Sequence, residues 1–233
     1  MKVLVIAAHP DDEILGMGGT ILKHRLKKDI VNVAYLATGI TSRKISIDNF
    51  DLELDTNEKK WKNDISQLRK NALSASKLLK VNNTEFFDFP DNAMDSVPLL
   101  KIVKVIEKLI QKYKPDRIYT NYYGDLNIDH RTVYNATLTA CRPLNYIVKE
   151  LFCFEVLSST EWNYPYTFNP NYFVNIQNQL DKKIKAMSFF KSEIQKFPHP
   201  RSKENIKFVA GRWGAISGFN AAEAFEMIRK LEK

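Results

Sequence analysis

The chain has 233 residues, of which 44% are hydrophobic and 27% charged, and a formal net charge of +8 at pH 7. These values are ordinary for a globular protein of one α/β domain, and this length buries enough surface to fold without cross-links. Two cysteines argue against a disulfide framework and favour a reducing compartment. Acidic residues 11–13 interrupt the N-terminal apolar run, and no run reaches the ~20 apolar residues of a membrane span. We therefore expect a cytoplasmic protein without a signal peptide or membrane span.

The positive charge is spread over scattered lysines. The densest group, Lys59, Lys60 and Lys62, lies at the start of a predicted helix, and no basic stripe interleaved with aromatic residues occurs. We expect a solvated helix face here and no nucleic-acid partner. The net charge slightly favours a substrate that carries phosphate or a nucleotide.

Strands and helices alternate along the sequence. Apolar runs bounded by turn residues predict strands over residues 2–8, 31–37, 85–89, 117–121, 151–156 and 172–176. Apolar residues at helical spacing predict helices over residues 18–28, 58–80, 99–113, 179–190, 204–213 and 221–231, with another beginning near His130. Residues 40–57 are polar and aperiodic and are expected to form a loop. The alternation predicts an α/β fold with a mainly parallel sheet, as one domain over residues 1–233 that is less regular from about residue 150.

A histidine and two adjacent carboxylates follow the first predicted strand, in the segment Ala8-His9-Pro10-Asp11-Asp12-Glu13. Neighbouring carboxylates raise each other's pKa or bind a cation. His130 follows the fourth predicted strand, and the carboxyl ends of parallel strands form one ligand-binding edge. His9, Asp12 and His130 can therefore converge there, with one position left for water, which is the pattern of a catalytic zinc site.

The remaining acidic residues of these loops have expected roles beside the metal. Asp11 is the spare carboxylate and can accept the proton of metal-bound water as general base. Asp129 can orient an imidazole. The alternative makes Asp12 and Asp129 simple helix caps, but the histidines at the strand ends favour the metal. His24 falls on a charged helix face and is expected to be exposed.

These segments resemble a known family. The segment from Ala8 to Glu13, followed by Gly16-Met17-Gly18-Gly19, resembles the opening motif of the LmbE-like, or PIG-L, zinc-dependent de-N-acetylases. The later Asp129-His130 resembles the end of the family's second motif, and residues 69–81 are similar to one of its helices.

The resemblance implies a Rossmann-like fold and one zinc ion per chain, held by His9, Asp12 and His130 with Asp11 as the base. It implies hydrolysis of the acetamide of an N-acetylated sugar of the N-acetylglucosamine type, which releases acetate and a free amine. The expected partner is therefore a small N-acetyl sugar or sugar conjugate.

The chain departs from the family pattern at one position. Three residues before the last ligand many relatives carry a histidine, and here the residue is Asn127. An amide can donate a hydrogen bond to an oxyanion but cannot shuttle a proton. His199, in a segment restricted by flanking prolines, is the expected substitute, and the alternative is a surface histidine. Several family members place a C-terminal histidine near the metal, sometimes from a neighbouring subunit, which leaves a homo-oligomer open.

Substrate-binding candidates are suggested mainly by position. Arg201 can anchor a phosphate or carboxylate of the substrate, or can be a solvated residue at the start of the next helix. Arg43 and Asp91 lie in loops beside the expected site. A group of loop aromatics can stack on sugar rings or serve as packing caps, and it comprises Tyr122, Tyr123, Trp162, Tyr164 and Tyr166.

Other functions remain open from the sequence. A Rossmann-type nucleotide-binding oxidoreductase is opposed because residues 16–19 are not G-x-G-x-x-G and because the acidic residues would repel pyrophosphate. Asn127 leaves room for a degenerate member that only binds metal or sugar, although a purely structural zinc site has no use for the unliganded Asp11. An amidase acting on a peptide or amino acid is the third alternative, since zinc chemistry is indifferent to what surrounds the carbonyl.

Overall fold

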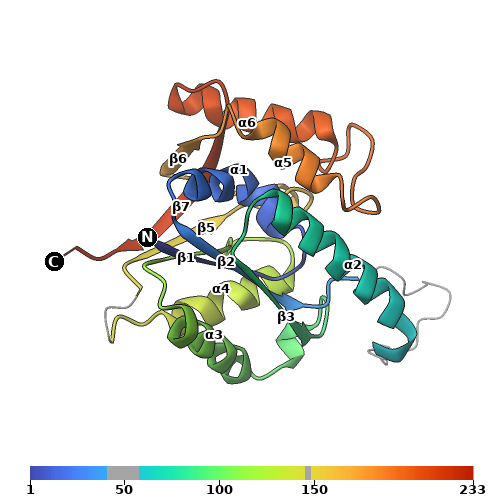
Figure 1. Ribbon diagram of the computed structural model, residues 1–233, viewed down its shortest axis with the longest axis vertical. Helices are drawn as coiled ribbons and strands as arrows, with labels where there is room; N and C mark the ends of the chain where they lie inside the picture. The colour runs from blue at the N-terminus through green and yellow to red at the C-terminus, as the bar shows by residue number, and fades with distance from the viewer. Residues whose placement is uncertain (41–57, 145–147, 233) are drawn as a thin grey trace.

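A sheet of seven strands forms the centre of the computed structural model, which describes residues 1–40, 58–144 and 148–232 (Figure 1). The strands are β1 Lys2–Ala7, β2 Ile30–Ala37, β3 Asn83–Phe89, β4 Arg117–Asn121, β5 Glu150–Phe154, β6 Tyr172–Asn175 and β7 Ala222–Lys230. Their order is β3-β2-β1-β4-β5-β7-β6. Only β7 runs antiparallel to its described neighbours, β5 and β6. The prediction of an α/β fold with a mainly parallel sheet is confirmed.

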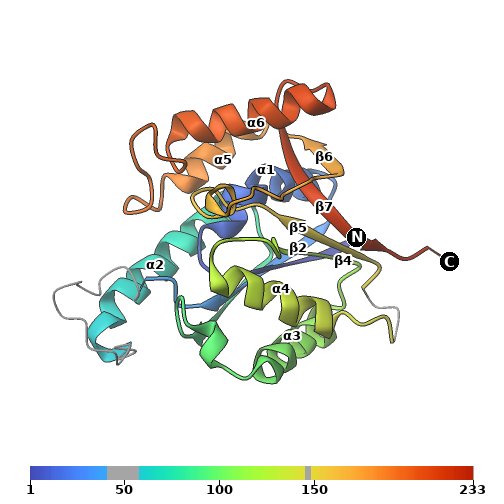
Figure 2. The same cartoon turned by 180° about the vertical axis from the view of Figure 1, so that it is seen from behind.

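Helices cover both faces of the sheet, as the two opposite views show (Figures 1 and 2). One face carries α1 Asp12–Leu26, α2 Glu58–Leu78, α5 Leu180–Met187 and α6 Lys203–Ser217. The other face carries α3 Leu99–Tyr113 and α4 Ile128–Ala140. Two short 3₁₀ helices, η3 Met94–Ser96 and η4 Thr160–Trp162, lie in the connections.

The central strand β1 is buried on both of its faces. Successive side chains of a strand point to opposite sides. Val3 and Val5 accordingly pack in the core under α1, whereas Leu4 and Ile6 pack in the core under α3 and α4. None of these four side chains is exposed. A continuous apolar run is therefore the pattern that this strand requires.

The strand order reverses between β1 and β4, which pair in parallel. The helix after β1 lies on one face of the sheet and the helix after β4 on the other, so their connections separate at this point. In doubly wound sheets the crevice for ligands opens here, beyond the carboxyl ends of the strands. The loops that contain His9 and Asp125 thus lie at the two sides of one crevice.

The predicted helix over residues 221–231 is wrong, because this segment is β7. Alanine and glutamate have good helix propensity, but tertiary context overrides such local preferences. Here the buried carboxylate of Glu223 accepts hydrogen bonds from Gly19 N at 2.9 Å and from Lys183 Nζ at 2.7 Å. These partners come from α1 and α5 and stabilise a strand that the local sequence does not favour.

The expected exposure of His24 is also wrong. The first helix begins at Asp12, earlier than predicted, and His24 is only 7% exposed. Its Nδ1 lies 2.7 Å from Asp29 Oδ2 and its Nε2 lies 3.1 Å from Tyr119 Oη. These two partners satisfy a histidine that the charged residues around it suggested was on the surface.

Three further expectations concern the cysteines, the membrane and the loop. Cys141 and Cys153 are buried free thiols. Among the described residues, no helix is long and apolar enough to cross a bilayer. The expected loop over residues 40–57 lies, apart from its first residue, outside the described residues.

Two glycines of α6 provide a test of how closely this helix packs against the residues that follow it. A Cβ on Gly214 would lie 2.5 Å from Phe219 O and 2.9 Å from Ala221 N, whereas a Cβ on Gly211 would meet nothing within 4 Å. We expect Gly214→Ala to lower the free energy of unfolding by about 1–3 kcal/mol through overpacking. The matched Gly211→Ala should raise it by up to ~1 kcal/mol through helix propensity. Urea unfolding of both variants measures the difference, and equal stabilities would contradict the close approach of α6 to residues 219–221, which lead into β7.

Candidate metal centre

Three predicted ligands meet at the crevice. His9 follows β1, Asp12 is the first residue of α1, and His130 lies in the first turn of α4. His9 Nδ1 lies 3.3 Å from His130 Nε2 and 3.7 Å from Asp12 Oδ2. His130 Nε2 lies 3.3 Å from the same oxygen. One ligand atom from each residue thus falls within 4.8 Å of the others, a spacing that suits a single metal ion.

The donor set fits a divalent cation. Asp12 is fully buried, and its Oδ1 has no hydrogen-bond partner among the residues that the structure describes. Its Oδ2 accepts hydrogen bonds from His9 N at 2.9 Å and from Asn121 Nδ2 at 3.0 Å. An unsatisfied buried carboxylate oxygen is unfavourable unless another group binds it. Two imidazoles and one carboxylate are ligands that zinc binds in catalytic sites.

The electrostatics of the cluster also favour a cation. Burial opposes the charged form of His130, but the charges of Asp12 and Asp125 raise its pKa to about 9. Burial likewise opposes ionisation of Asp12, yet His130 and His9 hold its pKa well below its usual value. A metal ion must therefore displace protons from these imidazoles.

The carboxylate of Asp11 contacts the C-terminal part of the chain and does not belong to the converging group of His9, Asp12 and His130. It accepts a 2.9 Å hydrogen bond from Arg201 Nη1, which also donates to Glu193 Oε2 at 2.6 Å. The backbone of Asp11 has φ of 114°, a conformation that an L residue rarely adopts. Its carbonyl accepts the first hydrogen bonds of α1, but its side chain makes no capping hydrogen bond.

The third acidic residue of the motif, Glu13, loses its charge by protonation and not by pairing with a cationic side chain. It is 1% exposed, and burial raises its pKa to about 8. Tyr35 Oη donates a 2.6 Å hydrogen bond to Glu13 Oε1. Glu13 is therefore largely protonated at neutral pH, which removes one of three adjacent negative charges.

The far side of His9 is held by two carboxylates. His9 Nε2 lies 2.9 Å from Asp129 Oδ2 and 3.2 Å from Asp91 Oδ1. Asp129 also accepts hydrogen bonds from Asn92 N and Met94 N. The structure thus places Asp129, which we expected beside an imidazole, against His9, and it brings Asp91 to the same nitrogen.

Two residues of this cluster were missed by sequence reasoning. Asp125 Oδ1 lies 3.1 Å from His130 Nδ1, and Asn121 bridges Ala8 N and Asp12 Oδ2 through its amide. Both are fully buried. A polar residue at the end of a buried strand, and a carboxylate in the loop after it, were the available signals.

The two residues considered for stabilising the oxyanion, Asn127 and His199, have different hydrogen-bond partners. The side chain of Asn127 caps α4, since its Oδ1 accepts from Asp129 N at 2.8 Å and its Nδ2 donates to Asn92 Oδ1. His199 Nδ1 accepts a 3.1 Å hydrogen bond from Arg201 N. Its ring packs edge-on against Trp162, with centroids 5.8 Å apart.

The three residues that we expected to bind substrate, Arg201, Asp91 and Arg43, differ in their surroundings. Arg201 is only 8% exposed and pairs with Asp11 and Glu193 rather than lying free. Asp91 contacts His9, as described above. Arg43 lies outside the described residues. Of the loop aromatics, Tyr122 is fully buried, whereas Trp162 is 43% and Tyr164 82% exposed.

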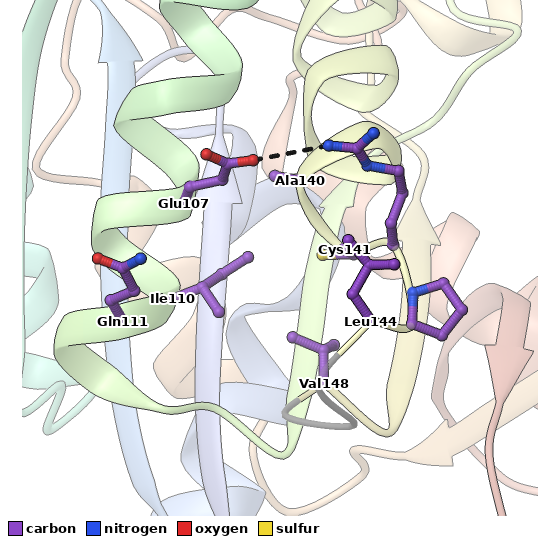
Figure 3. A pocket seen from close by; sticks show the side chains of 9 residues that line it. Glu107, Ile110, Gln111, Ala140, Cys141, Leu144 and Val148 are labelled. Carbon is purple, nitrogen blue, oxygen red and sulfur yellow. Dashed lines mark ion pairs between the residues drawn. The ribbon is translucent and has the colours of Figure 1, made fainter.

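A separate cavity of about 230 Å³ lies between the C-terminal ends of α3 and α4 (Figure 3). Glu107 and Arg142 form an ion pair across it at 3.9 Å. The helix α4 begins beside the candidate metal site and ends here, about 20 Å away at 1.5 Å per residue. This cavity therefore lies near the amino-terminal ends of the strands, whereas the candidate site lies at their carboxyl ends.

Comparison with known proteins finds relatives of nearly the whole chain. The family profile of PIG-L, described as GlcNAc-PI de-N-acetylase, matches residues 4–141. The diacetylchitobiose deacetylase of Thermococcus kodakarensis is 26% identical over 242 residues, which cover 97% of this chain and 83% of the relative.

Solved structures show the same fold. The N,N'-diacetylchitobiose deacetylase of Pyrococcus horikoshii has a TM-score of 0.73 at 20% identity, covering 98% of this chain and 84% of that one. The 4-carboxy-2-hydroxymuconate hydratase GalB of Pseudomonas putida also has a TM-score of 0.73, at 19% identity, covering 100% and 98%. At these identities the likeness concerns the fold alone. The profile match, which extends over more than half of the chain, shows that this protein belongs to the PIG-L, or LmbE-like, family.

Proposed function

We propose that this protein is a zinc-dependent hydrolase that removes the acetyl group from an N-acetylated sugar. The observation that carries the proposal is the convergence of His9, Asp12 and His130 on one point, beside the separate carboxylate of Asp11. Family membership and the deacetylase relatives support N-deacetylase activity on N-acetylated sugars. A zinc ion held by these three residues would lower the pKa of a coordinated water toward ~7 and polarise the acetamide carbonyl.

The residues of the chain supply the proton transfers. Asp11 takes the proton of the attacking water as general base. Its position is fixed by Arg201, which is itself held by Glu193. Protonated Asp11 then donates this proton to the departing amine nitrogen, because the amine leaves only after protonation.

His199 stabilises the oxyanion in this proposal. Its Nδ1 accepts a hydrogen bond from Arg201 N and therefore carries no proton. Burial and the charge of Arg201 lower the pKa of His199, which favours the neutral ring with hydrogen on Nε2. That N–H is available to donate to the negative oxygen. Asn127 is the second candidate donor, although its amide hydrogen bonds to Asn92.

The proposed substrate is a small N-acetyl sugar or sugar conjugate. The relative in Thermococcus kodakarensis is named as a diacetylchitobiose deacetylase, and the matched profile as GlcNAc-PI de-N-acetylase. Trp162 presents a partly exposed indole beside His199 and can stack on a sugar ring. The net charge of +8 suits a conjugate that carries phosphate.

Metal removal tests the proposed hydrolysis. Acetate release is measured over free, nucleotide-linked and lipid-linked N-acetyl sugars, before and after dialysis against a chelator. We expect release from at least one class, its loss on chelation, and its recovery with about one zinc ion per chain. Release that ignores the chelator would contradict the metal mechanism, and no release from any class would favour a protein that only binds metal or sugar.

Replacement of Asp11 tests the general base. Asp11→Asn removes the proton acceptor and should lower kcat by about 10²–10⁴-fold. Zinc content should remain at the wild-type level, because Asp11 is not one of the three converging residues. Asp181→Asn, which changes an exposed carboxylate of α5, is the matched control and should behave as wild type. Unchanged turnover in Asp11→Asn would remove this residue from the mechanism.

The pH dependence of zinc affinity tests the cluster itself. Zinc binds neutral imidazole, and the pKa of His130 is raised to about 9. Below that pH, zinc must displace this proton, so affinity should fall about tenfold for each pH unit and proton displaced. An ordinary histidine of pKa ≈ 6.5 would give constant affinity above about pH 7. Competition titrations with a chelating dye at several pH values distinguish the two, and a flat profile between about pH 7 and 9 would contradict the raised pKa.

A further inference from the structure

Each imidazole of the proposed metal site has a carboxylate on its far side. His9 directs Nδ1 toward the other ligands, and its Nε2 lies 2.9 Å from Asp129 Oδ2. His130 directs Nε2 toward them, and its Nδ1 lies 3.1 Å from Asp125 Oδ1. The two histidines thus present different nitrogens to the proposed metal position. In each ring, the other nitrogen is the one that lies beside a carboxylate.

Asp125 is itself held rigidly. It is 0% exposed, and its Oδ1 accepts hydrogen bonds from Asn127 N at 2.8 Å and from the hydroxyl of Ser159. Its Oδ2 accepts from Thr160 Oγ1 at 2.5 Å. These donors come from two connections, the one after β4 and the one after β5. A carboxylate bound at both oxygens from two sides cannot rotate away from His130.

The Nδ1 side of the His130 ring faces Asp125. Its Nδ1 is buried and forms no hydrogen bond of good geometry with a described residue, and the carboxylate oxygen Oδ1 of Asp125 lies 3.1 Å from it. An imidazole can carry its proton on either nitrogen, and the group bound to one nitrogen decides which. A carboxylate beside Nδ1 keeps the proton there and leaves the lone pair of Nε2 for the metal.

We propose that Asp125 is a positioning residue that holds His130 in the Nδ1–H tautomer, and that Ser159 and Thr160 support it through their hydroxyls. This inference rests on the proposed metal site. It assigns a function in metal binding to the segment after β5, which contributes no ligand of its own. Asp125 acts through His130 and does not itself contact the reacting groups.

Zinc affinity, measured by competition with a chelating dye, tests the proposal without any substrate. Removal of a carboxylate behind a metal-binding histidine typically weakens the metal about 10–100-fold. We expect zinc affinity to fall about 10-fold in Asp125→Asn, which keeps an acceptor but loses the charge, and about 100-fold in Asp125→Ala. Thr160→Val keeps the side-chain shape while removing the donor to Oδ2, and should produce a smaller loss. Asp181→Asn is again the control.

Two further measurements separate this role from the metal site and from folding. His130→Ala removes the proposed ligand; if it binds zinc like wild type, the metal site itself is wrong. If His130→Ala loses zinc but both Asp125 variants keep wild-type affinity, the metal site stands and the positioning role is overturned. Thermal unfolding of the metal-free variants reports folding, and Asp125→Asn or Thr160→Val provides the affinity test should Asp125→Ala not fold.

The tautomer is observed directly. Long-range proton–nitrogen spectra of the zinc-loaded, ¹⁵N-histidine-labelled protein should show His130 protonated at Nδ1 and metal-bound through Nε2. In Asp125→Ala, or in Asp125→Asn if that variant alone folds, the Nδ1 proton should exchange faster with water, because its buried acceptor is lost or weakened. A spectrum of His130 unchanged in these variants would overturn the proposal.

Discussion

Three adjacent carboxylates are buried at the end of one strand, and the arrangement of the site around them depends on how their negative charges are compensated. Asp11, Asp12 and Glu13 are 2%, 0% and 1% exposed. Buried like charges on neighbouring residues cannot all remain ionised unless other groups compensate them. Each is relieved differently. Arg201 pairs with Asp11, the imidazoles of His9 and His130 face Asp12, and Glu13 takes up a proton at a pKa of about 8. These separate solutions produce three chemically different groups from one run of acidic residues.

The compensating groups also determine how distant parts of the chain meet. Arg201 reaches Asp11 from 190 residues away and also donates to Ser158 Oγ, in the connection after β5. The next two residues of that connection bind Asp125, which lies behind His130. Asp11 and His130, the proposed base and one proposed ligand, are therefore supported by the same short segment. A displacement of this segment would change both the position of Asp11 and that of His130.

The sequence predicted the parallel sheet and the convergence of His9, Asp12 and His130, because both depend on local patterns. The apolar run of β1 and the polar residues after it follow one another directly, and parallel strands bring such ends together. Partners from distant segments had no local signal: the lysine that stabilises Glu223 in β7 lies in α5, and the tyrosine that binds His24 lies in β4. The same limit made Arg201 look like a free anion anchor, since neither Asp11 nor Glu193 is near enough in sequence to reveal the buried pairing.

The fold positions this site but does not by itself decide its reaction. A structure of the same fold is named as a hydratase, and both hydration and amide hydrolysis begin with a base that activates water. The reactions differ in where the second proton goes: hydrolysis must protonate a departing nitrogen, and hydration must protonate carbon. The base can return its proton to a nitrogen bound beside it, as Asp11 does in the proposed mechanism, whereas a distant carbon needs a separate acid. Because Asn127 cannot shuttle a proton and the pKa of His199 is lowered, the proposed mechanism assigns both proton transfers to Asp11, an arrangement that amide hydrolysis can use.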